Sequence, residues 1–337
     1  MVTVKNPDWR IVADGVDATA KMRDRLLRLR VSDEAGIESD TAEIELDNRD
    51  GALALPRTGA ELQVFLGWRG GALVDMGLYV VDEIRTSGMP RTMVISANAA
   101  DMRRSFKAQK TTSWHDTTIG AIVATIGAAH GLAPVVAPEL AGVQIPHMDQ
   151  TGESDMAFLS RIARQYDAVA KPAYGKLIFV PRGQAKAASG RQMATVSMSY
   201  AAGDISSWRT TIADRGRYGA VKAHWHDQGA GERKVVIAGG EEPSMTLPNS
   251  FPNEAAARAA AAGKLAALTR GTATLSLTGP GRLDLFAEGR VVLAGCDAAA
   301  DGEWSITKVE HSLGKSEGLT FSLEAETPRT TAPSNPV

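Results

Sequence analysis

The sequence lacks the features that mark several classes of protein. Its one cysteine, Cys296, excludes an intramolecular disulfide, and it also excludes a structural zinc site that takes two or more cysteines from one chain. No stretch has the ~18 uninterrupted apolar residues of a transmembrane helix, since Arg258 and Lys264 break the alanine-rich run Ala255 to Leu268. Residues Met1 to Trp9 contain no apolar segment of a signal peptide. We therefore expect synthesis in the cytosol and no membrane insertion.

The chain also has no excess of either charge. Its 337 residues include 37 basic and 39 acidic side chains, a net charge of −2, which gives no general attraction to nucleic acid or acidic lipid. Hydrophobic residues make up 44%, so wholesale disorder is excluded. The 33 glycines and 15 prolines predict many turns and short strands. At ~150 residues per domain, the length predicts two or three domains.

The first part of the chain has the two-residue period of β-strands. Leu27, Leu29 and Val31 alternate with polar neighbours, and similar runs recur at roughly ten-residue spacing between glycine-containing turns. One apolar and one polar face per strand is typical of an antiparallel barrel or sandwich. We predict a β-barrel domain over residues 1–105.

The period changes to that of helices in the next part. Apolar residues at 3.6-residue spacing predict two helices, the first N-capped by Asp116 or Thr117 and ended by Gly131, the second beginning at Ser154. A hairpin of 168–172 and 176–180 follows. Residues 106–190 are therefore predicted to form a small α+β module.

Alternation returns in residues 191–327, which we assign to a second β-barrel domain. An alanine-rich helix at 253–270, N-capped by Asn253, interrupts this region. The tail 328–337, rich in Thr, Pro and Ser, is predicted to be disordered. The predicted fold class is thus mainly β, with two similar antiparallel barrels that flank an α+β module.

An internal similarity supports this duplication. The segment that begins at Gly77 and its following strand at Thr92 resemble the segment at Gly302 and its following strand at Leu319. In each, a glycine precedes a strand with an aromatic residue, then a glycine-containing turn and a second strand. We infer two copies of one barrel plan.

The candidate nucleotide-binding and catalytic motifs lack the neighbouring residues and elements that these functions need. The Gly279-Pro280-Gly281 segment lacks the third glycine and the following helix of a nucleotide site, and the chain has no phosphate-loop or nucleophile-elbow string. Cys296, with His311 nearby in sequence, is a nucleophile candidate, but a small buried strand residue is the preferred interpretation. No cofactor is predicted.

His224 and His226 are the only metal candidates. Two histidines at i and i+2 on a strand share one face, but the sequence nominates no third ligand, so a solvated strand edge is preferred. No catalytic residues are predicted.

Charged groups are explained as surface features. Three acidic pairs lie in or beside turns, and two basic runs are interleaved with apolar residues, as on an amphipathic element. The pairs are Asp47/Asp50, Asp82/Glu83 and Glu241/Glu242, and the runs are 21–28 and 102–107.

Several strings resemble one known family, the late control protein D family of contractile-tailed bacteriophages. The resemblance covers about Trp9 to Glu326. Its strings are Trp9-Arg-Ile-Val-Ala-Asp-Gly, residues 24–50, Gly77-Leu-Tyr-Val-Val-Asp-Glu-Ile, residues 114–122, residues 150–163, Trp208-Arg-Thr and Tyr218-Gly-Ala-Val.

The resemblance implies a baseplate hub, related to the hub half of type VI secretion spike proteins. It implies a homotrimeric ring, threefold by chain and near-sixfold by barrel, in the tail baseplate of a virion or headless tailocin. The implied partners are the central spike, the tail tube or its initiator and the tape-measure protein, with wedge proteins as further candidates. No enzyme activity and no sequence-specific nucleic acid binding is implied.

Two alternatives stay open. The helix pair within 111–166 loosely resembles a LysM-type wall-binding module, which suggests a peptidoglycan-binding or lytic tail-tip protein. A metal-dependent enzyme built on His224 and His226 is the third possibility.

Overall fold

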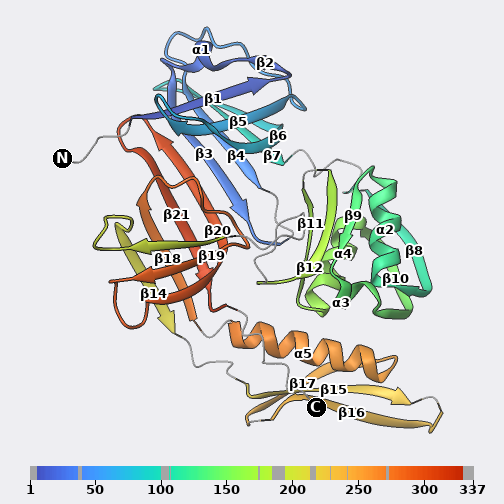
Figure 1. The fold of residues 1–337 in the computed structure, drawn as a ribbon. Coiled ribbons are helices and arrows are strands. Elements are labelled where there is room, and N and C mark those ends of the chain that lie inside the picture. The colour runs from blue at the N-terminus through green and yellow to red at the C-terminus, as the bar shows by residue number, and fades with distance from the viewer. Residues whose placement is uncertain are drawn as a thin grey trace.

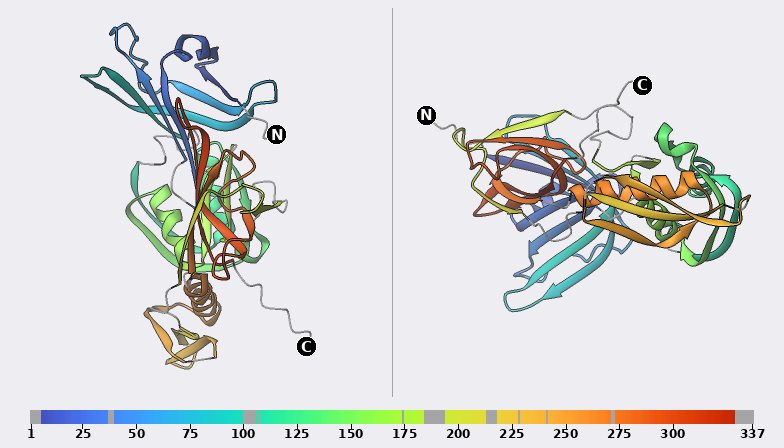
Figure 2. Two further views of the ribbon diagram at one scale, coloured as in Figure 1. Left: turned by 90° about the vertical axis from the view of Figure 1, so that its left-hand side faces the viewer. Right: turned by 90° about the horizontal axis from the view of Figure 1, so that it is seen from below.

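The computed structural model describes residues 6–36, 40–99, 106, 108–173, 175–183, 194–212, 218–227, 229–240, 242–270 and 273–328. Figure 1 shows two β-barrels, an α+β module beside them, and a small sheet with a helix at the end opposite the first barrel. The left view in Figure 2 shows the same order along the molecule. No helix within these described ranges is long and apolar enough to cross a membrane.

The first barrel is built from six strands and a short β2. Alternating apolar side chains fill it, including Leu29, Ile44, Val64 and Ile95, each no more than 2% exposed. Its elements are β1 (Pro7–Ala13), β2 (Val16–Asp17), α1 (Thr19–Met22), β3 (Leu26–Glu34), β4 (Thr41–Asp47), β5 (Glu61–Trp68), β6 (Val74–Ser87) and β7 (Thr92–Ala99).

The second barrel has its own core around Leu275, Val309 and Phe321. Its strands are β13 (Thr195–Ser199), β14 (Ser207–Ile212), β18 (Ala273–Pro280), β19 (Arg290–Ala294), β20 (Gly302–Gly314) and β21 (Gly318–Glu326). One pair departs from the antiparallel prediction, because β13 runs parallel to β19, whereas β1 runs antiparallel to β5. Residue alternation shows which face is buried but not strand direction.

The two barrels share one strand order. Neighbours follow β1-β5-β6-β7-β4-β3 in the first and β13-β19-β20-β21-β18-β14 in the second, so in both the strands, numbered along the chain, are arranged 1-4-5-6-3-2. Both hairpins, β6-β7 and β20-β21, have a register shift at the same place, after Val81 and after Ile306. The predicted internal similarity is confirmed at the level of strand pairing.

The α+β module lies between β7 and β13 along the chain. Ser154 N-caps its second long helix, as predicted, and Gly131 ends the first with a φ of 68°. The predicted N-caps Asp116 and Thr117 are wrong, because Thr118 accepts the hydrogen bond from the Ala121 amide. The elements are β8 (Gln109–Thr118), α2 (Ile119–Ala129), β9 (Ala133–Val136), α3 (Pro138–Ala141), β10 (Gln144–Ser154), α4 (Asp155–Gln165), β11 (Ala168–Ala173) and β12 (Lys176–Pro181).

An insertion between β14 and β18 forms a separate unit. Its strands pair with one another and not with the described barrel strands, and the helix packs on them around a small core of Val221, Ala223 and Ala257. The unit consists of β15 (Ala220–Asp227), β16 (Glu232–Gly239), β17 (Ser244–Phe251) and α5 (Glu254–Arg270). Asn253 caps α5 as predicted, since its Oδ1 accepts from the Ala256 amide at 2.8 Å. From the sequence we assigned these strands to the second β-barrel domain. The structure corrects this assignment, because the strands form a sheet of their own.

Residues 329–337 of the predicted tail lie outside the described residues.

Candidate interaction surface

A seam between β3 and β20 joins the barrels into one sheet. Residues 308–314 of β20 pair antiparallel with 28–34 of β3, while the start of β20 pairs with β19. The seam buries Val31, Val309 and His311, each no more than 1% exposed. The result is a continuous run of strands in the order β14-β18-β21-β20-β3-β4-β7-β6.

One face of this run is polar. Arg30 lies 3.7 Å from Glu43 and 3.6 Å from Glu310, while Lys308 pairs with Glu34 across the seam. Most of these side chains are a third or more exposed, so each pair contributes little stability, about 0–1 kcal/mol. The opposite faces of the same strands supply the two barrel cores. The run therefore presents a surface of paired charges over an apolar interior.

A buried charge cluster attaches the α+β module to the first barrel. Lys171 of β11 donates to Asp33 at 3.0 Å, to Asp40 at 2.7 Å and to the Glu34 carbonyl at 2.9 Å. Burial, together with the neighbouring carboxylate of Asp33, raises the pKa of Asp40 to about 6, although Lys171 opposes the shift. Burial alone would lower the pKa of Lys171, but the two carboxylates raise it above its usual range. Lys171 is thus held charged between two barrel acids.

This cluster predicts a dependence of stability on pH. In an unfolded chain Asp40 has a pKa near ~3.9, so as the pH rises from about 4 to about 6 the unfolded state releases this proton first. The folded state binds more protons in that window, so the free energy of unfolding should fall by up to about 2–3 kcal/mol as the pH rises. Urea titrations of the wild type and the Asp40→Asn variant between pH 4 and 7 check this. Equal slopes in the two proteins would contradict the prediction.

A second buried cluster attaches the insertion. Arg270, the last residue of α5, forms two hydrogen bonds with Asp167 after α4, one of 2.6 Å, and its Nε lies 3.1 Å from Glu326 of β21. Burial opposes the charge, but the two acids raise the pKa of Arg270. Arg270 and Asp167 are 2% and 6% exposed. One guanidinium thereby connects insertion, module and second barrel.

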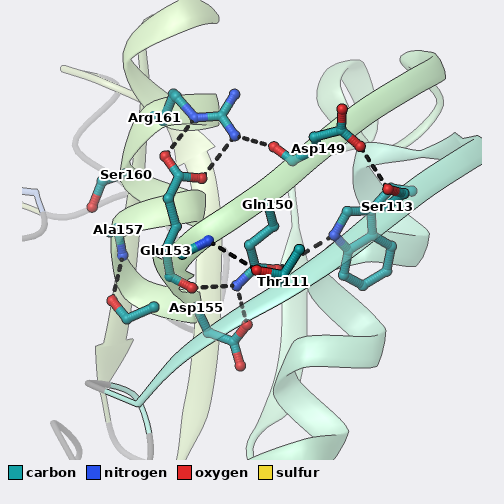
Figure 3. Close-up of polar contacts among 12 residues, drawn as sticks. Thr111, Ser113, Asp149, Gln150, Glu153, Asp155, Ala157, Ser160 and Arg161 are labelled. Carbon is teal, nitrogen blue, oxygen red and sulfur yellow. Dashed lines mark hydrogen bonds and ion pairs between the residues drawn. The ribbon is translucent and has the colours of Figure 1, made fainter.

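A polar network fixes the interior of the α+β module (Figure 3). The side-chain amide of Gln150 donates to Asp155 at 2.9 Å and to the Glu153 carbonyl at 3.1 Å. Asp155 also pairs with Lys110 at 2.7 Å and with His130 at 2.8 Å. Burial alone would raise the pKa of Asp155, but the hydrogen bonds from its partners lower it. Its partners make Asp155 a structural acid that holds β8, β10 and α4 together.

The metal candidates His224 and His226 lie on β15. They are opposite Val235 and Arg233 of β16, two positions apart on one face. Within the described ranges, no group of three or more His, Cys, Asp or Glu side chains is placed to hold a metal ion. The structure therefore brings no third ligand to the two histidines among the residues it describes.

The Cys296 and His311 candidates have separate surroundings. His311 is fully buried in the seam, where its Nε2 lies 3.3 Å from the Leu285 carbonyl. Burial, with Asp301 and Asp297, raises the pKa of the Cys296 thiol, which disfavours the reactive thiolate. Cys296 is half-buried and lies after the end of β19, so the predicted buried strand position is wrong, while its raised pKa argues against the nucleophile.

Packing explains the Gly279-Pro280-Gly281 segment. A Cβ at Gly279 would lie 2.3 Å from the Asp204 carbonyl and 2.6 Å from the Phe321 ring, and one at Gly281 would lie 2.4 Å from Leu319. Both glycines permit a close approach of β18 to its neighbours.

Residues of the acidic pairs and basic runs form hydrogen bonds and ion pairs with other residues of the same chain. Asp50 forms a 2.6 Å ion pair with Arg25, Asp82 accepts from Asn98 at 3.2 Å, and Arg23 lies 3.1 Å from Asp8. Glu241 and all of the run 102–107 except Phe106 lie outside the described residues.

The residues that join the units were not identified from the sequence. Lys171 carried a local signal, because it is the one charged residue in the apolar strand Ala-Val-Ala-Lys-Pro-Ala. Asp33 and Asp40 gave no such signal, since acids next to a turn are common on surfaces. Arg270 was predicted as a helix end, where a basic residue is ordinary.

Comparison with known proteins identifies the family. A model described as the phage tail baseplate hub (GPD) matches residues 39–317. The probable baseplate hub protein of Escherichia phage P2 is 35% identical, over 95% of this chain and 93% of that protein. A tail protein from Neisseria meningitidis MC58 has a similar fold, with a TM-score of 0.71 and 15% identity over 96% of this chain and 97% of that one. A component of the E. coli type VI secretion system has a TM-score of 0.56 and 12% identity, over 91% of this chain and 74% of that one. The chain therefore belongs to the phage tail baseplate hub family and is a component of the tail baseplate.

Proposed function

We propose that this hub is a homotrimeric ring that adapts a sixfold tail tube to a trimeric central spike. The observation that carries the proposal is the strand order shared by the two barrels. One chain offers two similar units, so three chains offer six near-equivalent barrels while keeping threefold symmetry. The fold similarity to a component of the type VI secretion system supports the same role.

The proposed partners follow from this position. The sixfold side of the ring meets the tail tube or its initiator, and the threefold side meets the spike, with tape-measure and wedge proteins nearby. The role is mechanical and needs no catalytic group. It fits a structure in which the buried ion pairs of Lys171 and Arg270 join one unit to another.

The experiment is to measure assembly of the purified chain alone and with the spike protein from the same genome. Mass photometry and negative-stain electron microscopy should show closed trimers with six similar lobes. A chain that stays monomeric under both conditions would contradict the proposal.

A further inference from the structure

We propose that His115 and His147 bind one Zn²⁺ ion across the outer strand pair of the α+β module. Strands β8 and β10 form a two-stranded sheet that pairs with no other described strand, and they lie on the side of the module away from the barrels (Figure 1). The register places His115 directly opposite His147. The site lies outside the seam and does not depend on the proposed ring.

The two imidazole rings have the separation of two ligands of one metal ion. Their Nδ1 atoms lie 3.1 Å apart, and the ring planes are tilted by 33°. Two nitrogens bound to a tetrahedral Zn²⁺ ion at ~2.0–2.1 Å lie about 3.3 Å from each other. The side chain of His147 is 54% exposed and His115 is exposed as well, so small rotations of the rings admit the ion without disturbing a core.

An acidic side chain orients His147 for this role. Nε2 of His147 lies 3.2 Å from Oδ2 of Asp149, and the Ser113 hydroxyl donates to Oδ1 of the same carboxylate at 2.6 Å (Figure 3). The Ser113 hydrogen bond, together with His147, holds the pKa of Asp149 below its usual range, so the carboxylate stays ionised. A carboxylate only accepts, so Nε2 of a neutral His147 carries the hydrogen and Nδ1 has the free lone pair. Metal-binding histidines have this arrangement, in which a carboxylate fixes the ring and makes it a stronger ligand.

His115 supplies the second nitrogen by changing its tautomer. Before the ion binds, Nδ1 of His115 carries the hydrogen that it donates to the lone pair of His147 Nδ1. When the ion binds, Nδ1 of His115 releases this proton to water and Nε2 takes one up, so the ring stays neutral. Within the described residues, no third His, Cys, Asp or Glu is placed to bind the same ion, and water fills the remaining positions.

The sequence pattern singled out a different pair, His224 and His226. Two residues at i and i+2 on one strand are about 7 Å apart along the strand, whereas residues opposite each other on antiparallel strands have Cβ atoms only ~4.5–5.5 Å apart. His226 also lies opposite Arg233, whose positive charge disfavours a cation. This pair is therefore a matched control for His115 and His147.

The bound ion fastens two strands that have few other means of staying together. A two-stranded sheet is marginally stable by itself and depends on what packs against it. An ion that binds only when β8 and β10 are paired stabilises the paired state. Zn²⁺ should therefore slow hydrogen exchange in residues 109–118 and 144–154, and this effect should be absent from the His115→Gln variant.

Isothermal titration calorimetry with Zn²⁺, on the full chain without a histidine tag, tests the site. The wild type should bind one ion per chain. Asp149→Asn should weaken binding by about tenfold, because it removes the charge that orients His147, and His115→Gln should weaken it further, because it removes a ligand. The control variant with His224→Gln and His226→Gln should bind like the wild type.

The ligands are identified with Cu²⁺, which imidazole also binds. Electron paramagnetic resonance of the Cu²⁺-loaded chain should show coupling to two nitrogens in the wild type and in Asp149→Asn, and to one in His115→Gln. Both substituted side chains are exposed, so the variants should fold, which circular dichroism checks. Zn²⁺ binding that is absent from the wild type, unchanged in His115→Gln, or lost in the control variant would overturn the proposal.

Discussion

Val309→Asp is expected to lower the free energy of unfolding by about 4 kcal/mol or more. Val309 is fully buried in the core of the second barrel and lies opposite Asp33 in the seam. The new carboxylate would be taken out of water next to Asp33, whose cation Lys171 is already shared with Asp40, and burying such a charge is among the most costly single changes in a protein. The expected result is partial unfolding centred on β20 and β3.

The internal repeat supplies the matched control. Ile84 is the equivalent of Val309 in the first barrel, since each lies three residues after the start of the register shift in its hairpin. Ile84 is only half-buried, so Ile84→Asp should cost clearly less. Hydrogen exchange followed by mass spectrometry suits a chain of several units, for which one unfolding midpoint is poorly defined. Val309→Asp should remove protection from β3 as well as from β20. Protection in β3 equal to that of the wild type would show that the seam does not couple the barrels.

Local patterns in the sequence predicted the parts of the fold that local forces determine. The alternation of Leu27, Leu29 and Val31 predicted a strand, and Ser154 and Asn253 were identified as helix caps because a cap depends on residues within one turn. The hairpins at Gly77 and Gly302 could be compared for the same reason, since each is a continuous segment.

Pairing between distant segments was not predicted. The strands at 220–227 and 232–239 alternate like barrel strands, and only the folded chain shows that they form a sheet of their own under α5. The seam joins β3 to a strand more than 270 residues later in the chain, a contact for which alternation gives no information. The ion pair of Lys171 with Asp33 spans 138 residues.

The candidate surface was anticipated only in outline. The duplicated barrel plan indicated where repeated edges should occur, but the residues at those edges depend on the register of four neighbouring strand pairs. Ile212 is an ordinary strand residue in the sequence, and its 70% exposure shows that it is unusual.

Arg270→Ala is expected to lower the free energy of unfolding by about 3–5 kcal/mol. The variant leaves Asp167 buried with no cation to offset its charge, and it also frees Glu326 from its partner. The insertion, the end of α4 and β21 lose their common contact. Thermal and denaturant unfolding measure the loss, and limited proteolysis should cut first within 213–272.

Two further variants separate the buried charge from the missing side chain. Arg258→Ala, on the same helix, removes an exposed i,i+4 pair with Glu254 and should cost no more than about 0.5 kcal/mol. Adding Asp167→Asn to Arg270→Ala should recover part of the stability, since it removes the unpaired charge and asparagine tolerates the φ of 50° at this position. If the double variant were as unstable as Arg270→Ala alone, the cost would come from lost packing of the arginine and not from the orphaned carboxylate.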